Sequence, residues 1–144
     1  MSILDEIKNR LQGKISDWHE HNPQRIYFSV DKQDIREVAR ILFKDMGLRY
    51  AIASGIDTPK GFEILYHFSF DKTGQIVSVR VFIEDKNNPE IDSLAVISPA
   101  FEWIEREIWE MLGINFIGHP NLKRLLLAED WPEGKYPLRC QREP

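Results

Sequence analysis

Residues 98–130 read SPAFEWIEREIWEMLGINFIGHPNLKRLLLAED. The stretch begins with a helix that has clear start and stop signals, and after it the apolar residues follow no regular spacing. Ser98 is a good N-cap, and Pro99 is a good first helical residue because an N–H at that position has no partner within the helix. Gly113 supplies the left-handed conformation that lets a chain leave a helix. These signals predict a helix over residues 99–112. The segment after it is rich in Gly, Pro and aromatic residues, so something other than periodic packing must hold it.

The two sides of this helix differ in character. Its apolar residues fall on one face, which we expect to pack on a sheet: Phe101, Ile104, Ile108, Met111 and Leu112. The rest carries tryptophans and mostly negative charges: Glu102, Trp103, Glu105, Arg106, Glu107, Trp109 and Glu110. We expect Arg106 to pair with Glu102 and Glu110, although such pairs stabilise a helix by only about 0.2–0.5 kcal/mol each. Aromatic side chains among unbalanced carboxylates are typical of a partner surface, but a solvated acidic face gives the same pattern.

The residues before this helix predict an α+β fold. Several stretches alternate apolar and polar residues, as half-buried strands do. Strands are predicted at residues 25–30, 48–54, 63–70 and 75–84, with a turn at 55–61 and a short edge strand at 91–97. Helices are predicted at residues 3–15 and 32–46. The expected architecture is a two-layer antiparallel β-sheet with helices packed on one side, in a domain at residues 1–113.

The last part of the chain, residues 114–144, is predicted to form an extended C-terminal docking arm. It holds four of the eight prolines of the chain but also many large apolar residues, which a disordered tail would lack. We expect part of the arm to lie on its own domain, with residues 125–127 as a short added strand. Residues 131–138 are expected to lie on another subunit. His119, in a Gly-His-Pro turn, is expected to position the turn rather than to bind a metal.

Composition argues against several classes of protein. A net charge of −4 gives no support to non-specific nucleic-acid binding, which needs concentrated positive charge. Cys140 is the only cysteine, so the chain alone can form no disulfide, no Cys-rich zinc site and no iron–sulfur cluster, and a reducing cytoplasmic setting fits best. No apolar run approaches the roughly 20 residues that span a bilayer, and the first residues lack a signal-peptide pattern. We therefore expect no direct membrane insertion.

A set of motifs in the second half of the chain is similar to a known family. The motifs are EREIWEMLGINF at 105–116, GHP at 118–120, KR at 123–124, LL at 126–127, EDW at 129–131 and PLR at 137–139. Together they resemble the hydrophilic C-type subunit of respiratory complex I, the NADH dehydrogenase C-subunit family, which also occurs in related energy-converting nickel–iron hydrogenases. The resemblance extends back through Asp57 and the strand at 62–68. Three departures leave both branches open: Glu110 replaces the usual Asp, Leu112 replaces the usual Phe, and residues 140–144 replace the usual Lys-Asp-aromatic-Pro ending.

The resemblance implies an accessory subunit with no cofactor of its own, docked on the large D-type subunit that houses the quinone site or the nickel–iron site. It implies a small iron–sulfur subunit as a second partner, with iron–sulfur clusters and the quinone or nickel–iron site held by other subunits. The implied location is peripheral, on the cytoplasmic side of the cell membrane. The pattern carries over onto these interface positions: Glu105, Arg106, Glu107, Gly113, Phe116, Gly118, His119, Pro120, Arg124, Asp130, Trp131, Pro137, Leu138 and Arg139. The helix face adds Trp103 and Glu110, and we interpret residues 105–107 as acting between subunits.

Two hypotheses come from other classes. The first is a free-standing small enzyme that uses the carboxylates of Glu105, Glu107 and Glu110 together with His119. It needs a concave site that gathers at least two of these groups. The second is a metal-binding module built on His19 and His21, whose segment otherwise reads as a polar linker.

Overall fold

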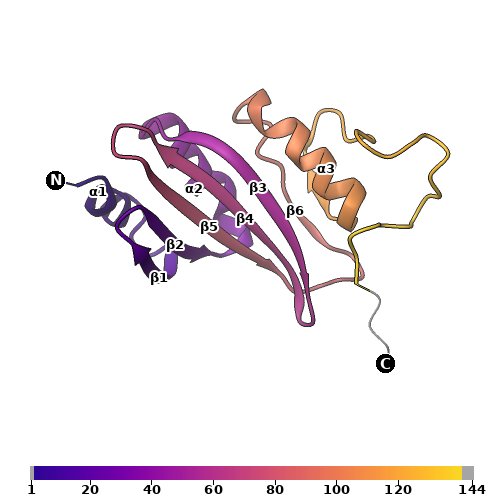
Figure 1. The fold of residues 1–144 in the computed structure, drawn as a ribbon, viewed down its shortest axis with the longest axis horizontal. Helices are drawn as coiled ribbons and strands as arrows, with labels where there is room; N and C mark the ends of the chain where they lie inside the picture. The colour runs from indigo at the N-terminus through magenta and orange to yellow at the C-terminus, as the bar shows by residue number, and fades with distance from the viewer. Residues whose placement is uncertain (1, 141–144) are drawn as a thin grey trace.

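A five-stranded sheet carries the fold (Figure 1). The computed structural model describes residues 2–140 and contains strands β1 (Ile15–Asn22), β2 (Arg25–Val30), β3 (Arg49–Thr58), β4 (Gly61–Phe70) and β5 (Gln75–Ile83). Their order in the sheet is β1-β2-β5-β4-β3. All neighbours are antiparallel except β2 and β5, which are parallel. The predicted α+β class is confirmed, but the parallel pair in the middle of the sheet was not predicted.

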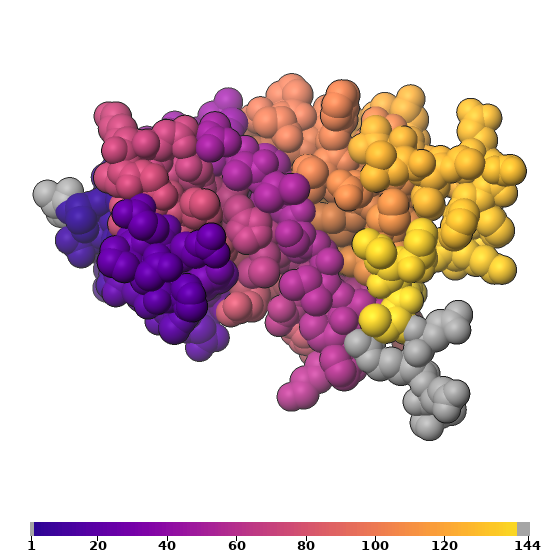
Figure 2. Space-filling view, viewed as in Figure 1, coloured from indigo at the N-terminus to yellow at the C-terminus, as the bar shows by residue number. Residues whose placement is uncertain are grey.

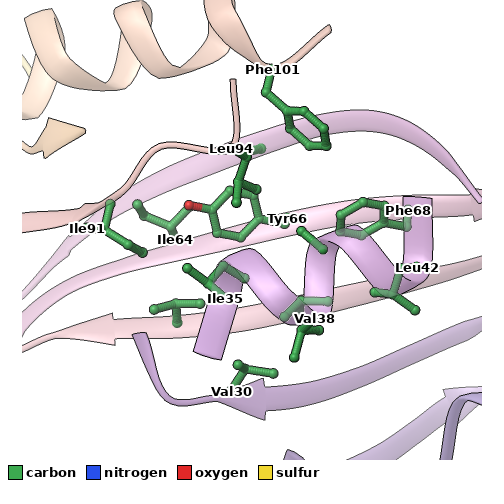
Figure 3. Close-up of a cluster of buried hydrophobic side chains, with 14 of the residues drawn as sticks. Val30, Ile35, Val38, Leu42, Ile64, Tyr66, Phe68, Ile91, Leu94 and Phe101 are labelled. Atoms are coloured by element: carbon green, nitrogen blue, oxygen red, sulfur yellow. The ribbon is translucent and has the colours of Figure 1, made fainter. Parts of the chain in front are cut away.

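The helices cover one face of this sheet. They are α1 (Ile3–Arg10), α2 (Ile35–Arg40) between the short turns η1 (Lys32–Asp34) and η2 (Ile41–Asp45), and α3 (Glu102–Leu112) after the turn η3 (Pro99–Phe101). Every second residue of β4 from Phe62 to Phe68 is fully or almost fully buried under them, whereas the residues between, such as His67, lie on the open face. Figure 3 shows α2 and Phe101 packed over Tyr66 and Phe68. The two-layer arrangement with helices on one side is therefore as predicted.

The predicted limits of the third helix are confirmed. The hydroxyl of Ser98 accepts a hydrogen bond from the Ala100 N–H at 3.2 Å, and Pro99 lies in the first turn, which is a 3-10 turn rather than an α turn. Gly113 ends the helix in the left-handed conformation, with φ of 78°. Capping chemistry alone therefore located both ends.

A second, two-stranded sheet joins the region before α3 to the region after it. Its strands are β6 (Glu90–Asp92) and β7 (Asn115–Ile117), which run parallel. The predicted edge strand at 91–97 is wrong, because the strand ends at Asp92 and pairs with β7 rather than with the main sheet. The added strand predicted at 125–127 is also wrong, since those residues form bends. Ile114 and Phe116 lie in the core, so packing continues beyond Gly113, and the domain division at that residue stays a prediction.

Two further expectations about the first half are wrong. The turn predicted at 55–61 is mostly strand, because β3 continues to Thr58 and β4 begins at Gly61. Gly55 lies directly under α3: a Cβ there would lie 2.7 Å from Leu112 Cδ1, so any larger residue would push the Leu112 side chain aside. The segment with His19 and His21 is the edge strand β1 rather than a linker. Within residues 2–140, no helix is long and apolar enough to cross a membrane.

Candidate docking surface

The flank of α3 that carries Glu105 faces inward. Glu105 is 1% exposed, and its carboxylate accepts hydrogen bonds from the Ser93 hydroxyl at 2.5 Å and the Leu94 N–H at 2.8 Å. Burial raises the pKa of Glu105 to about 7, even though both hydrogen bonds favour the charged form. The prediction that Glu105 faces a partner is therefore wrong. The apolar residues at 104 and 108 predicted the buried face, but nothing near 105 in the sequence reveals the donors at 93–94.

Glu110 and Arg106 hold the arm against α3. The Glu110 carboxylate is 3% exposed and accepts the N–H groups of residues 125, 126 and 127 at 2.9, 2.7 and 3.3 Å. One turn earlier, the Arg106 guanidinium donates to the carbonyls of Lys123 and Arg124 at 3.0 and 2.5 Å. The expected pairing of Arg106 with carboxylates of its own helix is wrong, since among residues 2–140 it bonds to backbone instead. In a segment without regular structure, Glu110 therefore satisfies backbone N–H groups and Arg106 satisfies backbone carbonyls.

The Gly-His-Pro turn begins the arm. His119 Nδ1 accepts the Asn121 N–H at 3.0 Å, so Nε2 carries the proton and donates to the Glu102 carbonyl at 3.0 Å. Both ring nitrogens are thus engaged with backbone, which agrees with a positioning role. Gly118, with φ of 85°, supplies the left-handed residue that the turn requires.

Residues 124–136 form a loop that closes on itself beside α3. Arg124 Nη1 donates to the carbonyls of Ala128 and Glu129 at 2.8 and 3.0 Å, and Trp131 Nε1 donates to the Lys135 carbonyl at 2.8 Å. A hollow of about 320 Å³ lies between this loop and Trp109 of the helix. Figure 2 shows the arm as the end of the molecule opposite α1. The loop is therefore ordered by its own side chains rather than by a sheet.

The end of the arm returns to the C-terminus of α3. The Leu138 N–H donates to the Met111 carbonyl at 3.0 Å, and Arg139 Nε donates to the Leu112 carbonyl at 2.6 Å. The Arg139 guanidinium also lies over the rings of Phe62 and Tyr136, at 5.1 and 4.7 Å from their centroids. These contacts satisfy carbonyls that the last turn of a helix leaves free.

A buried aspartate, Asp57, marks where the arm meets the sheet. Its carboxylate accepts the Cys140 N–H at 2.7 Å and pairs with Lys86. Its side chain is 2% exposed. The family resemblance includes Asp57. The sequence offers no sign that Lys86 and Cys140 meet there, because Lys86 comes 29 positions and Cys140 comes 83 positions after Asp57.

The remaining predicted interface positions divide into buried and exposed ones. Phe116 is 2% exposed and belongs to the core, and Glu110 is 3% exposed, so the predictions that these two residues face a partner are wrong. Trp103 is 68% exposed, and the exposed positions of the arm are Gly118, Pro120, Asp130, Trp131, Pro137 and Leu138. Glu107 is half-buried and makes no hydrogen bond or ion pair within residues 2–140. As partner contacts, these exposed positions stay predictions.

The geometry gives no support to either alternative hypothesis. Glu105 and Glu110 are each occupied by backbone N–H groups of different segments, and His119 bonds to helix and turn backbone, so no concave site gathers them. His19 and His21 are exposed on β1 with ring centroids 6.1 Å apart. Among residues 2–140 no group of three or more His, Cys, Asp or Glu side chains is arranged to hold a metal.

Known proteins are similar to this chain in sequence. The pattern of the family described as "Respiratory-chain NADH dehydrogenase, 30 Kd subunit" matches residues 28–143. The C subunit of NADH-quinone oxidoreductase from Chloroherpeton thalassium is 36% identical over 92% of this chain and 56% of its own length. The C/D subunit of the same kind of enzyme from Bacteroides thetaiotaomicron is 33% identical over 68% of this chain and 19% of its own length. The chain thus spans 19% of the length of the relative from Bacteroides thetaiotaomicron and 56% of the length of the relative from Chloroherpeton thalassium.

Solved structures share its fold. A chain of the membrane-bound sulfane sulfur reductase, an archaeal respiratory membrane complex, superposes with a TM-score of 0.84 at 23% identity, over 95% of this chain and 81% of that one. The trypsin-resistant fragment of Nqo5 superposes with a TM-score of 0.65 at 22% identity, over 83% of this chain and 96% of the fragment. The family pattern and the curated relatives together show that this chain belongs to the respiratory-chain NADH dehydrogenase 30 kDa subunit family, whose bacterial members include the C subunits of NADH-quinone oxidoreductase.

Proposed function

We propose that this chain is a non-redox assembly subunit of a complex I-type NADH:quinone oxidoreductase or a related energy-converting hydrogenase. In this proposal it docks on the large D-type subunit through α3 and the arm. The observation that carries the proposal is the arm: residues 118–140 lack helix and strand, yet α3 holds them in place through Arg106, Glu110 and the carbonyls of Met111 and Leu112.

The arm region is where apolar side chains stay uncovered. Of the nine exposed large hydrophobic residues among those described, five lie in α3 or after it: Trp103, Ile117, Leu126, Trp131 and Leu138. Leu126 is 62% exposed even though its own N–H is bonded to buried Glu110. A chain that fixes the backbone and leaves the apolar side chains outside presents a preorganised contact surface.

The names of the relatives support the choice of partner. The relative from Bacteroides thetaiotaomicron is a C/D subunit by name, which favours a D-type subunit as the neighbour of this chain. A small iron–sulfur subunit is the second partner in this proposal. The iron–sulfur clusters and the quinone or nickel–iron site belong to those subunits, and the complex holds this chain peripherally on the cytoplasmic side of the membrane.

Co-purification with the large subunit tests this proposal. Trp103→Ala and Leu126→Ala remove exposed side chains, so we expect each to reduce recovery of the large subunit about tenfold or more, as losing an interface anchor does. Phe82→Ala is the matched control, because Phe82 is also an exposed aromatic residue, 41% exposed, but lies on the open sheet face away from α3. All three variants are expected to unfold at the wild-type temperature. Recovery of the large subunit at the wild-type level by both test variants would contradict the proposed surface.

A further inference from the structure

The two edges of the main sheet are not alike. The β1 edge is irregular: its register shifts between Ser16 and His19 and again between Glu20 and Asn22, and Asp17 has a positive φ of 53°. Bulges of this kind disrupt the regular backbone pattern of an edge and so hinder its pairing with another chain. The β3 edge has the opposite character, since residues 50–56 contain no charged side chain and the pairing with β4 is regular from Ile52 to Thr58.

The outer side of β3 has no backbone partner of its own. Within residues 2–140 its residues 50–56 pair only with β4, and no turn or loop bonds to them from the other side. An edge strand directs about half of its N–H and C=O groups away from the sheet, so these groups form a template for one more strand.

Helix α3 turns this edge into a groove. A hollow of about 220 Å³ runs between residues 52–55 of β3 and residues 107–112 of α3, and Leu138 of the arm lines it as well. Gly55 lets Ile108 and Leu112 approach the strand, so its floor is apolar. Ile52 is 48% exposed at its rim. A strand edge beside a helix is the arrangement with which domains bind an extended peptide as an added strand.

Charge indicates the chemistry of the occupant. Glu107 lines the groove and makes no hydrogen bond or ion pair within residues 2–140. A carboxylate on an apolar groove attracts a cation carried by whatever enters it, and a half-buried position strengthens that preference. The other carboxylates of this part of α3, Glu105 and Glu110, are already occupied by backbone donors.

We propose that this groove receives an extended segment of the large subunit, which pairs with β3 as a sixth strand of the sheet. The segment places an apolar side chain between β3 and α3 and brings a lysine or arginine to Glu107. This inference rests on the proposed function, because it names the part of the partner that the docking surface binds.

Hydrogen exchange on this chain, alone and co-expressed with its large D-type subunit, tests the inference. In the free chain the outward amides of residues 52–56 exchange rapidly, and in the complex we expect their exchange to slow about tenfold or more because they become hydrogen-bonded. Peptides from β1 serve as the internal control and are expected not to change. Glu107→Lys places a like charge against the incoming cation and is expected to weaken the complex about tenfold or more. Glu20→Lys makes the same charge change on the β1 edge and is expected to leave affinity at the wild-type level.

The outcomes separate this inference from the proposed function. A complex that forms with unchanged exchange at 52–56 overturns strand addition and leaves the docking function standing. Failure of the wild-type chain to bind the large subunit overturns both. Protection of 52–56 that grows with the concentration of this chain alone assigns the edge to a second copy and also overturns the inference. Equal affinity of Glu107→Lys and Glu20→Lys for the large subunit overturns the proposed cation.

Discussion

Glu105 and Glu107 are two residues apart on one helix, yet their carboxylates have opposite roles. Glu105, like Glu110, is buried and accepts N–H groups from segments that α3 packs against, whereas Glu107 lies half-buried in a groove without a bonded partner among residues 2–140. The residue type is the same at both positions. The difference teaches that the acidic character of α3 serves two ends: Glu105 and Glu110 organise loops of the same chain, whereas Glu107 leaves its charge available.

The largest effect is expected from Glu110→Ala. The change leaves three backbone N–H groups of the arm without their acceptor, which should lower the free energy of unfolding by about 4 kcal/mol. Urea unfolding measures this, and trypsin cleavage after Lys123 or Arg124 reports release of the arm. Glu107→Ala is the matched control and is expected to change stability by less than about 0.5 kcal/mol. Equal losses in both variants would remove the distinction between the two carboxylates.

A pH dependence follows from Glu105. Its ordinary pKa of 4.5 is raised to about 7 by burial, so the folded chain keeps this proton at pH values where the unfolded chain has lost it. The contribution of Glu105 to stability is therefore full below pH 4.5 and is lost as the pH rises to about 7, by about 3 kcal/mol in all. Unfolding in urea at several pH values measures the slope. Glu105→Gln cannot titrate and should lack this component, and an unchanged slope in that variant would contradict the prediction.

A smaller effect is expected from Gly113→Ala, which tests how the arm returns to α3. A Cβ at this position would lie 2.6 Å from the Tyr136 ring and 2.8 Å from the Arg139 guanidinium, in addition to the cost of a positive φ. We expect a loss of about 2 kcal/mol in the free energy of unfolding. Gly47→Ala is the control, since its φ is also positive but nothing lies within 4 Å of the added Cβ. A loss no larger than in the control would mean that Tyr136 and Arg139 of the arm move aside without lowering the free energy of unfolding.

The smallest effect on stability is expected from Trp103→Ala. Trp103 is 68% exposed, so its removal from the isolated chain should change the free energy of unfolding by less than about 0.5 kcal/mol. Phe101→Ala, two residues earlier and fully buried, should cost about 3–5 kcal/mol. Thermal unfolding of the two variants measures the contrast. A large loss for Trp103→Ala would show that this residue stabilises its own chain rather than a contact surface.

Much of the fold could be predicted because its signals are local. The N-cap at Ser98, the glycine at 113 and the alternation within β4 and β5 each depend on neighbouring residues, and the structure confirms them. The second sheet could not be predicted, because residues 90–92 and 115–117 pair across the whole of α3. The irregular strand β1 was also missed, since bulges interrupt its alternation.

The sequence by itself determined where α3 begins and ends, which of its faces is apolar and which family the motifs resemble. These properties depend on capping, helical spacing and residue identity, all of which are present in the chain before it folds. Only the tertiary structure decided that Glu105 and Glu110 turn inward and that Glu107 does not. A buried carboxylate is stable only where donors meet it, and the donors at 93–94 and 125–127 reach α3 through the packing of distant segments.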